Sequence, residues 1–146
     1  MRFLDLPPVY LLLCLCVAYW VGQIAPVPLG AALSWLGDLV FYAGLGLIAI
    51  AAIEFLRHRT TIIPRRDPSG LITSGIYRLT RNPIYLADVM ILIGLTIRWE
   101  AVLALPLAPL FVWWITRHFI LQEEQTLGKT FPEAYPDYLS RTRRWI

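Results

Sequence analysis

The residues best suited to chemistry lie in two short polar stretches of an otherwise apolar chain. In "RLTRNPIYLADV" (residues 78–89), Arg81 precedes an apolar run that contains an acidic residue, Asp88. If a helix begins at Pro83, Tyr85 and Asp88 lie three residues apart and share a helix face. A carboxylate inside a membrane costs on the order of 2 to 3 kcal/mol unless it is paired or faces a polar cavity. A polar pocket beside this helix, a pair with an arginine and snorkelling toward headgroups are the three interpretations.

The second stretch is "FILQEEQTLG" (residues 119–128), in which Glu123 and Glu124 are adjacent. They come where an apolar helix should leave the membrane, and Gly128 is a plausible stop signal for that helix. Two carboxylates near a helix C-terminus oppose the helix dipole, which favours cations there. The pair is therefore either well solvated or close to positive charge, such as Arg81.

The composition predicts that these stretches are held by membrane-spanning helices. The 146 residues are 58% hydrophobic with a mean hydropathy of +0.59, whereas soluble domains are about 45 to 50% apolar. A helix that crosses the hydrocarbon core needs about 20 residues. We predict an all-α integral membrane protein with about four transmembrane helices in one domain, residues 1–146. The predicted spans are 8–29, 34–56, 83–97 and 101–121, of which the third is short.

Helix-end signals place the first stretch at a membrane surface. Pro83 suits the first position of a helix, and Asn82 suits the preceding N-cap, where its side chain accepts a backbone N–H. Glu54, near the end of the second apolar run, is interpreted as a boundary or packing residue.

Arginine placement predicts the orientation. Six arginines lie between the second and third apolar runs, five basic residues follow or close the fourth, and none lies in residues 22–34. The positive-inside rule puts both termini and the segment 57–82 in the cytoplasm. The expected cofactor-binding segments, 64–82 and 122–146, lie on that side. The net charge of +3 then favours contact with anionic headgroups over nucleic acid.

The C-terminal tail mixes aromatic residues with arginines, as interfacial amphipathic segments do. It is expected to anchor the chain to the bilayer surface or to cover a cofactor. Cys14 and Cys16 fall on different helix faces, so packing is expected of them rather than metal binding.

Two motifs together carry a family resemblance. "SGIYRLTRNPIYLADVMILIG" and, after a helical hairpin, "EEQTLGKTFPEAYPDYLSRTRRW" resemble the isoprenylcysteine carboxyl methyltransferase and phospholipid methyltransferase superfamily of integral membrane enzymes. The resemblance covers roughly residues 64–146. In that superfamily an Arg-His-Pro-x-Tyr pattern and a later Glu-Glu pair shape a cytoplasmic pocket for S-adenosylmethionine.

The resemblance implies a set of cofactor-binding positions in this chain, with Asn82 in place of the family histidine. Asn82 keeps hydrogen-bonding ability but does not titrate near neutrality. The implied positions are Gly75, Tyr77, Arg81, Asn82, Pro83, Tyr85, Glu123 and Glu124. Arg81, Asp88 and Glu123 are the candidate catalytic residues, because Asp88 or a glutamate could deprotonate an acceptor.

The expected function is S-adenosylmethionine-dependent methylation, on S, O or N, of a lipid-like or hydrophobic acceptor, with no metal. Two other readings stay open. The C-terminal parts of sterol reductases resemble this architecture and use NADPH, so a membrane oxidoreductase is one alternative. A non-enzymatic membrane module on the same scaffold is the other.

Overall fold

The computed structural model describes residues 6–58 and 70–146, and every regular element in these two ranges is a helix. The arginines at positions 59, 65 and 66 of the predicted cytoplasmic segment lie outside the described residues. In chain order the elements are α1 (Pro7–Ile24), α2 (Gly30–His58), the 3-10 turn η2 (Gly75–Arg78), α3 (Pro83–Arg98), the 3-10 turn η3 (Val102–Ala104), α4 (Leu107–Ile115), the π-helical segment η4 (Thr116–Ile120), α5 (Leu121–Thr130) and α6 (Ala134–Arg141). The predicted all-α class is confirmed.

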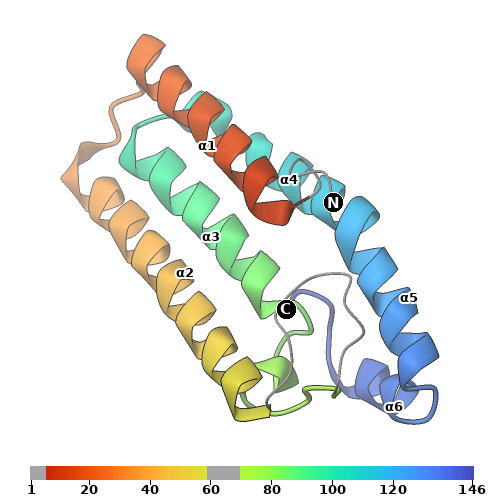
Figure 1. Cartoon of the computed structure of the whole chain (residues 1–146). Coiled ribbons are helices and arrows are strands. Elements are labelled where there is room, and N and C mark those ends of the chain that lie inside the picture. The colour runs from red at the N-terminus through yellow and green to blue at the C-terminus, as the bar shows by residue number, and fades with distance from the viewer. Residues whose placement is uncertain (1–5, 59–69) are drawn as a thin grey trace.

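Helix α3 lies between α2 on one side and α1 with α4 on the other (Figure 1). Small residues let α2 and α3 approach closely. A Cβ atom added to Gly37 would lie 2.8 Å from the carbonyl oxygen of Gly94, and one added to Gly44 would lie 3.0 Å from that of Ala87. Close backbone approach through small residues is a common source of helix association in membranes, so these glycines fix α3 against α2.

The number of spans differs from the prediction of four. In the described ranges three helical segments are long and apolar enough to cross a membrane: Pro7–Ile24, Gly30–His58 and Val102–Thr130. The 16 residues of α3 extend about 24 Å, less than the hydrocarbon core of about 30 Å. None of its apolar residues is exposed: Tyr85, Ala87, Ile91 and Leu92 are buried, and the others are buried or half-buried. The hydropathy pattern gave the position of this helix, but α3 is too short to count as a full-length span.

The last long helical segment runs well past residue 121, where the apolar run was expected to end. It consists of η3, α4, η4 and α5 in succession. The π segment η4 buries Phe119 and Ile120, and π turns recur at functional sites. Gly128 does not stop α5: the helix reaches Thr130, and the N–H of Phe131 closes it on the carbonyl of Leu127 at 2.8 Å.

The start of α3 matches the prediction in position but not in its cap. Asn82 is the N-cap residue and Pro83 is the first helical residue. However, the Asn82 side chain makes no capping hydrogen bond. Its amide instead donates to the carbonyl oxygen of Arg144 at 3.0 Å, because the C-terminal tail passes beside this helix end.

Candidate active site

The two polar motifs meet where the start of α3 faces α5. The Tyr85 hydroxyl donates to Oε1 of Glu123 at 2.8 Å. A terminal nitrogen of Arg81 lies 3.3 Å from Oε1 of Glu124, and their side chains are only 12% and 16% exposed. The helical hairpin thus brings residues about forty positions apart in the sequence into direct contact.

Glu124 is held by a second arginine from the C-terminal tail. Nε of Arg144 donates to Oε1 of Glu124 at 2.9 Å, and a terminal nitrogen donates to Oε2 at 2.7 Å. This two-point geometry is among the strongest ion pairs available to proteins. The hydrogen bond with Glu124 raises the pKa of the Arg144 guanidinium. Glu124 therefore neutralises two arginines and joins α5 to the tail.

The tail backbone is bound to the residues just before α3. The carbonyl oxygen of Arg144 accepts hydrogen bonds from Thr80 Oγ1 at 3.2 Å and from Asn82. The carbonyl oxygen of Arg143 accepts the N–H of Arg81 at 3.0 Å. We call residues 142–146 the strap, because they tie the motif before α3 to the glutamate pair.

Gly75 and Tyr77 lie at the same end of the helix bundle, in η2, between α2 and α6. The Tyr77 ring packs edge-on against Phe55, with ring centroids 5.8 Å apart. The Tyr138 hydroxyl of α6 donates to the Tyr77 carbonyl oxygen at 2.7 Å. Burial raises the pKa of both tyrosines above the usual range, so both hydroxyls keep their protons as donors.

Sequence reasoning missed the role of Glu54 at the end of α2. Glu54 is only 6% exposed. Its Oε2 accepts a hydrogen bond from Ser74 at 2.8 Å, Arg57 donates to its Oε1 at 3.2 Å, and Nε2 of His58 lies 2.8 Å from the Ser74 hydroxyl. A charged residue in the last turn of an apolar helix was the only signal available, because Ser74 is twenty residues away.

Glu54 also explains why position 75 is glycine. Gly75 has a φ of 55°, which L side chains rarely adopt. A Cβ atom there would collide with the Glu54 carboxylate. The glycine therefore lets η2 pack directly on a buried carboxylate of α2.

Two buried donors at this end have no hydrogen-bond partner among the described residues: Nε of Arg81 and the Tyr135 hydroxyl. Burial, followed by the charge of Glu124, raises the pKa of Tyr135 to about 12, so its hydroxyl is a neutral donor. A buried donor without an acceptor costs about 1 to 3 kcal/mol. Both lie beside Glu124, which gives the site unsatisfied capacity for an oxygen-rich ligand.

Asp88 and Pro83 stand apart from this cluster. Asp88 lies one helical turn beyond Tyr85, is 6% exposed, and makes no hydrogen bond or ion pair with a described residue. The alternative of a structural pair with an arginine is therefore not observed in the described ranges. Pro83 is buried at the helix start, where it shapes the backbone. No group of three or more metal-ligating side chains gathers within residues 6–58 and 70–146.

Fold and site together define a helical membrane protein with a polar site between the start of α3 and α5. We call this site the cradle; it is formed by Arg81, Tyr85, Glu123 and Glu124. Residues 32–134 match the phospholipid methyltransferase family, and the chain belongs to that family. This confirms the superfamily resemblance carried by the two motifs.

One curated relative is 30% identical over 114 residues, the cobalt-zinc-cadmium resistance protein CzcN of Cupriavidus metallidurans. The alignment covers 75% of this chain and 50% of the relative, so the chain spans about half the length of the curated relative that it matches. No solved structure matches the chain.

Proposed function

We propose that the chain is a membrane methyltransferase that uses S-adenosylmethionine to methylate a lipid-like or hydrophobic acceptor. The observation that carries the proposal is the meeting of the two motifs between α3 and α5. There Arg81 and Tyr85 contact the glutamate pair, and two buried donors lack acceptors among the described residues. Family membership supports the reaction class.

The donor set fits the chemistry of this cofactor. S-adenosylmethionine carries a carboxylate, an amine, ribose hydroxyls and a sulfonium. Nε of Arg81 and the Tyr135 hydroxyl are donors suited to the carboxylate, and glutamate oxygens suit the hydroxyls or the amine. When bound, the cofactor would supply an electrophilic methyl group.

The two glutamates take different roles in this proposal. Glu124 is saturated by Arg81 and Arg144, so it positions the arginines and the strap. Glu123 sits on the adjacent face, about 100° around the helix, where Tyr85 orients its carboxylate. We assign cofactor contact to Glu123, with Gly75 and Tyr77 forming the wall on the α2 side.

Asn82 has a positioning role in this account. Its amide donates to the strap, so it holds the tail over the cradle instead of carrying a proton. The tail would then act as a cover for the cofactor as well as an anchor at the bilayer surface.

Asp88 is the proposed proton acceptor for substrates that must lose a proton. It lies one turn from Tyr85 toward the bilayer interior, and no described residue neutralises it. A buried carboxyl group close to the cofactor-binding residues is suited to general base work. A thiolate or carboxylate acceptor would not need it.

The acceptor is proposed to enter sideways from the bilayer and the cofactor from the cytoplasm. The cradle lies at the end of apolar helices, and the arginine distribution favours a cytoplasmic position for this end. Correct alignment of two bound reactants can itself lower a barrier by several kcal/mol, so the chain's main task is positioning.

The test uses purified protein, S-adenosylmethionine with an isotopically labelled methyl group and a native lipid extract. Mass spectrometry should find a lipid that has gained one labelled methyl group, and Glu123→Gln should remove the product. Reduction of a lipid with NADPH, with no methyl transfer, would support the oxidoreductase alternative instead.

A further inference from the structure

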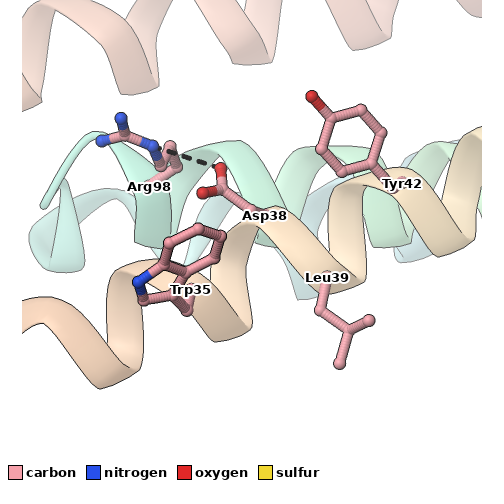
Figure 2. Close-up of a pocket in the computed structure, with 5 residues that line it drawn as sticks. All are labelled: Trp35, Asp38, Leu39, Tyr42 and Arg98. Carbon is pink, nitrogen blue, oxygen red and sulfur yellow. Dashed lines mark ion pairs between the residues drawn. The ribbon is translucent and has the colours of Figure 1, made fainter.

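A shallow pocket of about 550 Å³ lies at the opposite end of α3 from the cradle. Its lining comes from α2 and from the last residue of α3 (Figure 2). The residues are Trp35, Asp38, Leu39, Tyr42 and Arg98. The 16-residue helix α3 separates the pocket from Arg81 by about 24 Å. The methylation site and this pocket are therefore different places.

The pocket presents one positive and one negative group side by side. Nε of Arg98 lies 3.1 Å from Oδ1 of Asp38, and the side chains are 52% and 32% exposed. Figure 2 shows the two terminal nitrogens of Arg98 pointing away from Asp38. The ion pair thus leaves guanidinium donors and a carboxylate oxygen facing outward.

Depth in the membrane follows from the length of α2. Asp38 precedes His58, the last residue of α2, by 20 residues. At about 1.5 Å per residue this is about 30 Å, the thickness of the hydrocarbon core. If His58 lies at one surface, Asp38 lies where the opposite headgroups begin. Trp35 and Tyr42, 73% and 66% exposed, are residue types that concentrate at that level.

An apolar stripe continues from the pocket along α2 toward the other surface. Leu39, Tyr42, Gly46, Ile50 and Ile53 recur at spacings of three or four residues and are exposed. A Cβ atom at Gly46 would meet nothing within 4 Å, so the stripe has a notch at that point. Its shape and polarity suit an acyl chain.

We propose that this pocket binds one phospholipid with a zwitterionic headgroup. Its phosphate contacts the outward donors of Arg98, and its ammonium lies against Asp38 and the rings of Trp35 and Tyr42. Guanidinium donors match phosphate oxygens, and aromatic faces attract alkylammonium groups. Charge complementarity excludes a purely anionic lipid as the preferred occupant, because its headgroup would meet Asp38. The proposal is independent of the methyltransferase assignment.

The test is native mass spectrometry of the purified chain with phosphatidylcholine, phosphatidylethanolamine, phosphatidylglycerol or diacylglycerol at equal concentration. The two zwitterionic lipids should each give a single-lipid adduct at about tenfold lower concentration than phosphatidylglycerol, which corresponds to about 1.4 kcal/mol. Diacylglycerol should give no such adduct. Equal binding of all four lipids, or tighter binding of phosphatidylglycerol, would overturn the proposal.

Variants of the two charged residues test the cause of the headgroup preference. Asp38→Asn should reverse the preference toward phosphatidylglycerol, because it leaves Arg98 alone in the pocket. Arg98→Gln should abolish the preference, whereas Arg117→Gln, an exposed arginine of the last long helical segment, should not. Unchanged selectivity in both pocket variants would contradict the assignment.

Two further measurements test the contribution of the aromatic ring and that of the acyl chain. Trp35→Leu replaces an exposed ring and should weaken the phosphatidylcholine adduct several-fold, with Trp113→Leu, also exposed, as its matched control. Water-soluble glycerophosphocholine should not displace the lipid at equal concentration, because the acyl chain contributes to binding. Full displacement of the lipid by glycerophosphocholine would contradict the proposed contact between the acyl chain and the apolar stripe.

Discussion

At the scale of single residues, the two adjacent glutamates of α5 make different contacts. Glu124 receives three contacts from two arginines of distant segments. Glu123 receives the hydroxyl of Tyr85 on α3. Neighbouring side chains of a helix point about 100° apart, so Glu124 binds Arg81 and the strap while Glu123 accepts the hydrogen bond from Tyr85.

Replacing Glu123 with Gln should weaken S-adenosylmethionine binding about ten- to a hundredfold. The change removes a charge-assisted hydrogen bond of roughly 1.5 to 3 kcal/mol. Isothermal titration calorimetry of the detergent-solubilised protein measures the effect. Glu133→Gln, in the exposed tail, is the control and should bind normally. Wild-type affinity in the Glu123 variant would exclude it from the cofactor site.

Replacing Arg81 with Lys should also weaken cofactor binding, although the charge is retained. A lysine ammonium cannot supply both the buried Nε donor and the contact with Glu124, since it is a point charge and not a planar fork. The same titration reports the loss. If affinity and unfolding temperature both stay at wild-type values, Arg81 has neither the binding nor the structural role assigned here.

At the residue scale the sequence predicted which groups would meet, but not the individual pairs. The types at positions 81, 85, 123 and 124 predicted that cationic and acidic groups would meet, because a hairpin returns the chain to one surface. Which glutamate takes the arginines depended on the rotation of α5 after the π segment and on the position of Arg144. No local pattern encodes either.

At the scale of elements, the turn η2 and the strap, together with the long helices, stabilise the end of the bundle that contains the cradle. The turn η2 rests on the buried Glu54 through Gly75. The strap residues bind Thr80, Arg81 and Asn82 through backbone carbonyls. Sequence patterns located α3 correctly but gave Asn82 a capping role, since helix-end statistics do not anticipate a carbonyl group from sixty residues away.

Replacing Gly75 with Ala should lower the stability of the folded protein by roughly 1 to 3 kcal/mol. The new methyl group meets the Glu54 carboxylate and the positive φ is strained for alanine. Thermal unfolding in detergent, followed by intrinsic tryptophan fluorescence, measures the loss. Gly46→Ala is the matched control, because its Cβ meets open space in a helix. An unchanged midpoint for the Gly75 variant would show that η2 relaxes without cost.

At the scale of the whole molecule, three helical segments of the described ranges are long and apolar enough to span a membrane, and the shorter helix α3 lies between α2 on one side and α1 with α4 on the other (Figure 1). The sequence predicted apolar helices and their approximate bounds because length and hydropathy determine them. It counted α3 as a fourth span of full length, whereas the 16 residues of α3 extend only about 24 Å. Close packing through Gly37, Gly44 and Gly94 holds this short helix beside α2, from the site end to Asp38 at the other end.

The arginine asymmetry predicts that the site end faces the cytoplasm. Single cysteines at Ser140 on α6 and at Gln23 near the end of α1, both exposed, should label from opposite sides of sealed vesicles after Cys14 and Cys16 are replaced by Ser. A membrane-impermeant maleimide applied to intact cells should modify only the Gln23 variant. Labelling of the Ser140 variant from outside would reverse the proposed orientation.

We propose above all that the cradle between α3 and α5 holds a methyl donor. Parallel calorimetric titrations of the purified wild-type protein with S-adenosylmethionine and with NADPH distinguish this function from the oxidoreductase alternative. S-adenosylmethionine should bind saturably at one site per chain, this binding should be lost in the Arg81→Lys and Glu123→Gln double variant, and NADPH should not bind. Binding of NADPH alone, or of neither ligand by folded protein, would contradict this proposal.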